Sequence, residues 1–133
     1  MSSVAARSPY TGKFPTFTDP RGSLGVVEFG EVPFVPQRIF WIFGVAEGET
    51  RANHGHRECE QLVFVQQGSI GAVTIDRNGS TTEWTLGLGE YLDIPPRHWL
   101  QLKDFSEGAV VGVLASHPYD RSEYIDDPAD LSS

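Results

Sequence analysis

The chain has 133 residues, of which 39% are hydrophobic, so it is long enough for one domain with a real core and too short for two. Ten basic and 18 acidic residues give a formal net charge of −8, and the pI is about 4.8. This balance excludes the basic surface that a nucleic-acid partner requires, so we expect no nucleic-acid binding. An acidic protein can still hold a small phosphorylated ligand where a few arginines converge.

Short β-branched and aromatic runs follow one another along the chain, separated by many of its 14 glycines and nine prolines. Strands at such spacing are typical of an all-β sandwich or barrel. No internal repeat or low-complexity linker interrupts them, so we predict one domain over residues 1–133. Its core should span about residues 14–126, with the first dozen and the last five or so residues loose. We expect strands at residues 24–29, 37–43, 61–66, 70–75, 81–86, 91–94, 99–102 and 109–115.

Two local signals refine this outline. The pair Asn78-Gly79 lies between two alternating runs, which is a strong signal for a β-hairpin. The C-terminal stretch DRSEYIDDPADL predicts a helical turn instead of a strand, capped by Asp120 or Ser122.

Cys59 is the single cysteine, so no intrachain disulfide can form and a reducing compartment fits. Its neighbours Glu58 and Glu60 disfavour a thiolate, so we do not expect Cys59 to be a nucleophile. No apolar run approaches the roughly 20 residues of a membrane span. The first dozen residues lack the apolar centre of a secretory signal. We therefore expect a cytoplasmic protein with no membrane partner.

The segment RANHGHRECEQ, residues 51–61, contains two of the four histidines. If it forms a strand, His54 and His56 point to the same face, because side chains alternate along a strand. Small residues nearby, Ala52 and Gly55, leave room for the backbone here to approach another group. Two such histidines can also be ordinary solvated surface residues, but the polar groups around them favour a small-ligand site at the mouth of a barrel.

A metal site is one interpretation of this pair. The segment GETRANHGHRECE, from Gly48 to Glu60, is similar to the first metal-binding motif of the cupin superfamily. Two imidazoles and a carboxylate would suit iron, manganese, nickel or zinc. The second motif of that superfamily requires a histidine where this chain has Leu100, and His98 lies two residues too early. Three ligands with an open position can still bind a metal, so this alternative stays open, although we predict no metal and no cofactor.

Acid–base chemistry is the other interpretation, and we prefer it. An imidazole with a pKa near 6.5 can take or give a proton near neutral pH. Arg38 and Arg51 could stabilise an enolate oxygen or hold a diphosphate, although each could equally form a surface salt bridge. Several aromatic side chains could stack on a nucleobase, although core packing is the commoner role: Phe64, Tyr91, Trp41 and Trp99.

The order of motifs resembles the sugar 3,4-ketoisomerase family, whose members are cupins acting on dTDP-4-keto-6-deoxyglucose. The similar segments run in the same order from Asp19 to Ile125, nearly the whole domain. They are DPRGSLGVVEFGEVPFVPQRIFWIF, the His-x-His segment, EQLVFVQQGSI, IPPRHW and DFSEGAVVGVLASHPYDRSEYI, the last of which contains Tyr119 and Tyr124.

The resemblance implies a cupin jelly-roll barrel and a homodimer with exchanged N-terminal strands. It also implies a metal-independent shift of the keto group from C4 to C3 of a dTDP-linked sugar through an enediolate, with His54 and His56 carrying the protons. We expect six residues to hold the nucleotide sugar: Arg21, Arg38, Arg51, Asn53, Gln61 and Trp99. Arg21 would do so across the dimer.

Two residues depart from the family pattern. Phe40 replaces a tyrosine, and Asn53 replaces an aromatic residue before the first histidine. These changes permit a different sugar or a different stereochemical outcome. Three alternatives therefore remain: a 3,5-epimerase of the same kind of substrate, a metal-dependent cupin enzyme, and a sugar-nucleotide binding module without activity.

Overall fold

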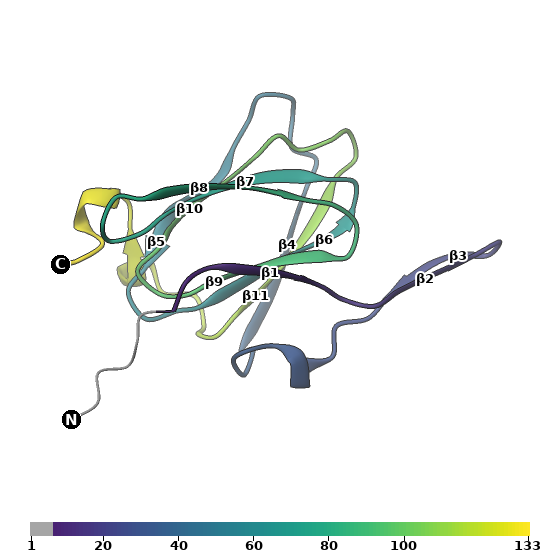
Figure 1. The fold of residues 1–133 in the computed structure, drawn as a ribbon, viewed down its shortest axis with the longest axis horizontal. Coiled ribbons are helices and arrows are strands. Elements are labelled where there is room, and N and C mark those ends of the chain that lie inside the picture. Colours follow the sequence, from purple (N-terminus) through teal and green to yellow (C-terminus); the bar gives the residue numbers. More distant parts are fainter. Residues whose placement is uncertain (1–6) are drawn as a thin grey trace.

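The structure is a computed structural model that describes residues 7–133, and within them two five-stranded antiparallel sheets face each other (Figure 1). The first sheet contains, in spatial order, β1 (Tyr10–Lys13), β9 (Glu90–Ile94), β6 (Gln61–Gln67), β11 (Val110–Ala115) and β4 (Arg38–Phe43). The second sheet contains β12 (Tyr124–Ile125), β5 (Arg51–His56), β10 (Trp99–Lys103), β7 (Ile70–Ile75) and β8 (Thr81–Leu86).

A hairpin of β2 (Thr16–Asp19) and β3 (Gly22–Gly25) projects away from these two sheets (Figure 1). In the described residues its strands pair only with each other. The helical segments of this part of the chain are short 3₁₀ turns at Phe29–Glu31, Arg121–Glu123 and Pro128–Asp130. None of them has the length and hydropathy that crossing a membrane requires.

The main core lies between the inner faces of the two sheets. Alternation along each strand selects the side chains that enter it. On β10, Leu100 and Leu102 are buried in this core, so Trp99 and Gln101 take the opposite face. The first sheet is also covered on its outer face, where Phe14 packs against Leu62 and Phe64. Burial on both faces explains the continuous apolar run of β6.

The predicted all-β single domain is confirmed, and so is the jelly-roll arrangement that the family resemblance implies. Seven of the eight expected strands are present, as β4 and β6–β11. The predicted hairpin is present as well, because β7 and β8 are joined by a turn in which Gly79 has a φ of 82°. That left-handed conformation suits glycine, which has no side chain to clash. Phe64 and Tyr91 take the expected packing role beside Phe14.

Other expectations were wrong. The strand expected at residues 24–29 is instead the end of β3 followed by a 3₁₀ turn. The short strands β1, β2 and β12 were missed. The ends are also less loose than expected: β1 pairs with β9, and Leu131 is fully buried. Residues 1–6 lie outside the described part of the chain. The C-terminal turn is confirmed in its 3₁₀ form, and Asp120 caps it by accepting a hydrogen bond from the backbone of Ser122.

Candidate active site

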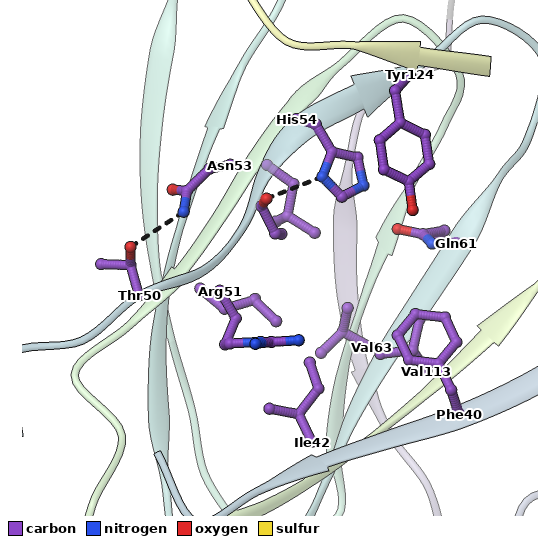
Figure 2. Close-up of a pocket in the computed structure, with 13 residues that line it drawn as sticks. Phe40, Ile42, Thr50, Arg51, Asn53, His54, Gln61, Val63, Val113 and Tyr124 are labelled. Carbon is purple, nitrogen blue, oxygen red and sulfur yellow. Dashed lines mark hydrogen bonds between the residues drawn. The ribbon is translucent and has the colours of Figure 1, made fainter. Parts of the chain in front are cut away.

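A cavity of about 400 Å³ opens at one end of the barrel, between the two sheets (Figure 2). This size suits a small ligand. One part of its lining is apolar: Phe40, Ile42, Ala52, Val63, Leu100, Leu102 and Val113. The remaining lining is polar: Thr50, Arg51, Asn53, His54, Gln61 and Tyr124.

The strand that carries the histidines contains a β-bulge. The register of β5 against β10 shifts so that Leu100 pairs with His54 and Gln101 pairs with Ala52, which leaves Asn53 as the extra residue. Ala52 and Asn53 have φ values of 69° and 63°, in the left-handed region that non-glycine residues seldom adopt. Such strain persists where the surrounding structure holds it, often at functional sites.

Side-chain hydrogen bonds hold the bulge in place. The amide nitrogen of Asn53 donates to the hydroxyl of Thr50 over 3.1 Å, and its amide oxygen accepts from Gln101 over 2.9 Å. An aromatic side chain at this position has no carboxamide and would not form this pair of bonds. The departure from the family pattern at Asn53 therefore stabilises the backbone just before His54.

His54 is fixed by contacts on two sides. Its Nδ1 lies 2.8 Å from the carbonyl oxygen of Ala52, and its ring stacks on Tyr124 with centroids 4.0 Å apart and an interplanar angle of 8°. A carbonyl can only accept, so Nδ1 carries the proton and Nε2 keeps its lone pair. Figure 2 shows this second nitrogen on the cavity side of the ring. Burial lowers the pKa of His54, so the imidazole is neutral near pH 7.

His56 lies behind His54. Their ring centroids are 4.9 Å apart, and His56 is 6% exposed and does not line the cavity. Within the described residues its Nε2 is buried without a hydrogen-bond partner. Burial, with a smaller contribution from the charge of His54, lowers the pKa of His56 to about 4. The two rings share one face as predicted, but only His54 reaches the cavity.

Gly55, between the two histidines, permits a close backbone contact. A Cβ atom at this position would lie 2.5 Å from the carbonyl oxygen of His98. The expectation that a small residue here lets the backbone approach another group is confirmed, and that group is the backbone of His98.

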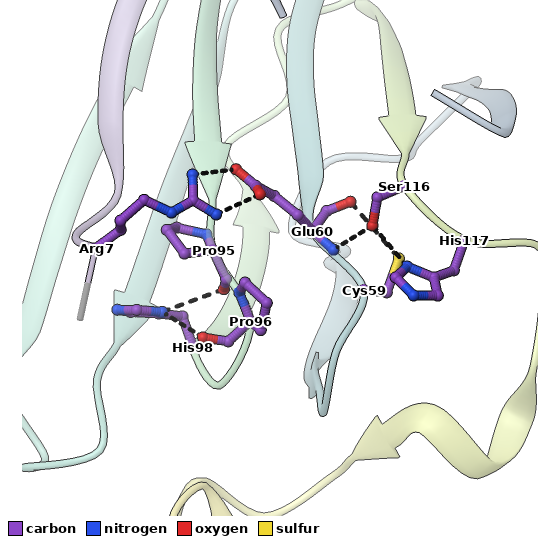
Figure 3. Close-up of polar contacts among 8 residues, drawn as sticks. All are labelled: Arg7, Cys59, Glu60, Pro95, Pro96, His98, Ser116 and His117. Carbon is purple, nitrogen blue, oxygen red and sulfur yellow. Dashed lines mark hydrogen bonds and ion pairs between the residues drawn. The ribbon is translucent and has the colours of Figure 1, made fainter. Parts of the chain in front are cut away.

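The glutamate of the metal-like motif takes part in a different interaction. Glu60 forms a two-pronged ion pair with Arg7, and one of the two bonds is 2.9 Å long (Figure 3). His98 directs Nδ1 to the carbonyl oxygens of Pro95 and Pro96. Within residues 7–133 no three His, Cys, Asp or Glu side chains are grouped closely enough to hold a metal ion. The side chains present do not fit the cupin metal site.

Three of the six predicted ligand-binding residues line the cavity, and three do not. Arg51, Asn53 and Gln61 line the cavity. Arg38 lies on the same face of β4 as Phe40, with its guanidinium 5.2 Å from the centre of that ring, and its buried Nε has no partner in the described residues.

Arg21 and Trp99 do not line the cavity of their own chain. Trp99 is on the outer face of β10, and its indole N–H donates to the carbonyl of Asp126 over 3.0 Å. Arg21 is at the turn of the projecting hairpin, where it pairs with Asp19 and its side chain is 90% exposed.

Tyr124 is a site residue that sequence reasoning did not select. It lies on β12, which pairs with β5 so that Tyr124 is opposite His56. Its ring also meets the edge of His56, with centroids 5.0 Å apart. The similarity of the C-terminal segment to the ketoisomerase family was the available signal, but nothing in the spacing connects a residue so late in the chain with the histidines.

Comparison with known proteins identifies relatives of this chain. The family model "FdtA: WxcM-like, C-terminal" matches residues 9–133. A TDP-4-oxo-6-deoxy-alpha-D-glucose-3,4-oxoisomerase from Aneurinibacillus thermoaerophilus is 35% identical over 116 residues, which cover 84% of this chain and 81% of that protein.

Two solved structures are similar over nearly the whole chain. The QdtA 3,4-ketoisomerase from Thermoanaerobacterium thermosaccharolyticum, a double mutant in complex with TDP, has a TM-score of 0.85 and 30% identity, covering 92% of this chain and 90% of that one. A 3,4-ketoisomerase from Helicobacter canadensis has a TM-score of 0.84 and 30% identity, covering 95% and 96%. The chain therefore belongs to the FdtA, WxcM-like C-terminal family.

Proposed function

We propose that this protein is a sugar-nucleotide 3,4-ketoisomerase that moves the keto group of a TDP-linked 4-keto-6-deoxyhexose from C4 to C3. The observation that carries the proposal is the free Nε2 of His54, which faces a cavity of ligand size and is held there by Ala52 and Tyr124. The relatives named above as 3,4-ketoisomerases support the reaction, and the TDP bound to one of them supports the nucleotide.

The chemistry requires one base and a place for negative charge. The hydrogen on C3 is acidic because C3 is next to the C4 carbonyl. Nε2 of His54 removes this proton, and the electron pair forms a C3–C4 double bond and an oxyanion at C4. A proton then moves from the C3 oxygen to the C4 oxygen, and the imidazolium returns a proton to C4. The product has a C3 carbonyl and a C4 hydroxyl, so no electrons enter or leave.

We assign His56 to the same proton-transfer unit. Two imidazoles with centroids 4.9 Å apart disfavour a second positive charge, so the pair takes up at most one proton beyond those of the two neutral rings. Because the pKa values of both rings are lowered, both imidazoles are neutral near pH 7, so each still has a lone pair that can accept a proton.

Arg51 is our candidate for binding the diphosphate. It lines the cavity, and within the described residues no acidic side chain pairs with it. A planar guanidinium matches phosphate oxygens in pairs. Arg38, Asn53 and Gln61 complete the proposed substrate-binding set.

We also propose that two chains form a homodimer with exchanged N-terminal strands. Ile39, Trp41 and Phe43 on the outward side of β4 are 57–65% exposed, and Phe17 and Leu24 of the hairpin are 60% and 58% exposed. Soluble monomers seldom leave such large apolar patches uncovered. An exchanged hairpin would cover them and carry Arg21 toward the cavity of the partner. The single, buried cysteine is compatible with the cytoplasmic location that we propose.

Nuclear magnetic resonance of TDP-4-keto-6-deoxyglucose incubated with the protein tests the activity. We expect a new 3-keto product and exchange of solvent deuterium at C3 or C4. Exchange at C5 would instead show a 3,5-epimerase. Activity lost on chelation and restored by iron, nickel or zinc would show a metal-dependent enzyme. Tight TDP binding without any turnover would show a binding module.

A further inference from the structure

The ring of Tyr124 is held in a fixed position beside the proton-transfer pair. It stacks on His54 and meets the edge of His56, and the guanidinium of Arg121 lies over it, 4.7 Å from its centre. Its backbone is paired with β5. A side chain with contacts on several faces has little freedom, so its hydroxyl points to a defined place in the cavity (Figure 2).

That hydroxyl is available for a ligand. Thr50 and Tyr124 supply the side-chain hydroxyls of the cavity lining, and Thr50 is already bonded to Asn53. In the described part of the chain the Tyr124 hydroxyl has no hydrogen-bond partner, although it lies on the side of the cavity where Gln61 is (Figure 2). Phe40, in the lining of the same cavity, offers no hydroxyl.

The reaction needs a group of this kind. His54 handles the proton bound to carbon, but a second proton must pass from the C3 oxygen to the C4 oxygen. The mediating group must donate and accept at once. An amide such as Gln61 or a guanidinium such as Arg51 donates without exchanging its proton readily, and His56 does not line the cavity. A phenol can do both.

We propose that Tyr124 is a further catalytic residue, whose hydroxyl gives its proton to the C4 oxygen while it accepts the proton of the C3 hydroxyl. This inference rests on the proposed ketoisomerase function. The step is balanced: the phenol ends with one proton, as it began, the C4 oxygen gains one and the C3 oxygen loses one. Donation to the C4 oxygen also stabilises the oxyanion formed when His54 removes the C3 proton.

The test compares Tyr124→Phe with the unchanged protein and with Tyr119→Phe. Tyr119 is a suitable control because it is in the same C-terminal segment, is 62% exposed and does not line the cavity. In Tyr124→Phe, the ring that stacks on His54 is kept and only the hydroxyl is lost. We expect kcat to fall about 100-fold and KM to change by less than about threefold, while Tyr119→Phe stays near the unchanged rate.

Deuterium exchange gives a signature that a structural role would not produce. Without the relay, His54 can still remove and return the C3 proton. Exchange into unreacted substrate should therefore exceed product formation in Tyr124→Phe, but not in the unchanged protein. In Tyr124→Leu, which also removes the stack on His54, exchange and product formation should fall together.

Three results would overturn the assignment in distinguishable ways. If Tyr124→Phe turns over as fast as Tyr119→Phe, the hydroxyl has no catalytic role. If exchange and product formation fall equally in Tyr124→Phe while its fold is unchanged by circular dichroism, the residue positions His54 and relays no proton. If the unchanged protein gives neither product nor exchange at C3, the proposed function fails and the relay with it.

Discussion

The carbonyl oxygen of Ala52 and Nδ1 of His54 are 2.8 Å apart, and this bond leaves the lone pair of the imidazole on Nε2. Ala52 reaches this position because of the bulge, where it adopts a φ of 69°. The backbone strain and the orientation of His54 are therefore parts of one arrangement. With Nδ1 protonated, the lone pair of Nε2 is directed toward the cavity.

The pH dependence of the reaction should reflect the lowered pKa of His54. A base works only when it is deprotonated, and burial shifts the pKa of this imidazole below its ordinary 6.5. We expect the decline of kcat/KM at acid pH to have its midpoint below pH 6.5. A midpoint at or above pH 6.5 would contradict this, provided that circular dichroism shows the protein still folded at that pH.

Replacement of Gly55 by alanine tests the close approach of two backbones at the histidine pair. The new Cβ would lie 2.5 Å from the carbonyl oxygen of His98, so strand β5 or the loop before β10 must shift. We expect Gly55→Ala to lower the free energy of unfolding by about 2 kcal/mol and to reduce activity, because His54 moves with the strand. Gly30→Ala is the control, since no atom lies within 4 Å of that Cβ. Equal stability of the two variants would contradict the contact.

The buried carboxyl of Asp93 should make the protein less stable as the pH rises. Asp93 is fully buried, and burial, followed by interaction with Glu60, raises its pKa to about 9. The folded state favours the protonated form of Asp93. The contribution of this group to the free energy of unfolding is therefore fully present below the unfolded pKa of about 4, and it is lost progressively as the pH rises toward 9.

Asp93→Asn keeps the shape and removes this titration. We expect it to be more stable than the unchanged protein at pH 8 in urea denaturation, with an advantage that shrinks as the pH is lowered. Glu47→Gln, at an exposed position, is the control for the loss of one negative charge. An advantage that does not depend on pH, or a loss of stability at pH 8, would argue against a protonated Asp93.

Sequence alone predicted the parts of this molecule that depend on local pattern. Alternation and the Asn78-Gly79 turn identified β7 and β8, and the spacing of His54 and His56 placed both rings on one face. Side chains alternate along β10, so burial of Leu100 and Leu102 places Trp99 on the outer face. The aromatic character of Trp99 had suggested a ligand-binding role instead.

The features that sequence missed depend on contacts between distant segments. Strand β1 exists because β9 pairs with it, and the place of Tyr124 depends on pairing with β5. Likewise, nothing around Glu60 predicts that Arg7 binds it, because 53 residues separate them. Local propensity carries no signal for such partners.

Arg21 offers a test of the exchanged dimer. We expect Arg21→Ala and His54→Asn each to be nearly inactive alone. If Arg21 serves the cavity of the partner subunit, co-expression of the two variants should restore about a quarter of the unchanged activity, because random pairing in a two-fold dimer leaves that share of sites intact. Dimers by sedimentation without any recovery would contradict the assignment of Arg21. Monomers by sedimentation would contradict the dimer itself.

The proposed reaction is tested most directly by NMR in deuterated water, which follows the C3 hydrogen of TDP-4-keto-6-deoxyglucose with the unchanged protein and with His54→Asn. We expect the unchanged protein to form the 3-keto product. In His54→Asn we expect product formation and C3 exchange to be slowed by at least about 100-fold, while TDP binds with a nearly unchanged Kd. Turnover by His54→Asn at the rate of the unchanged protein would contradict this expectation.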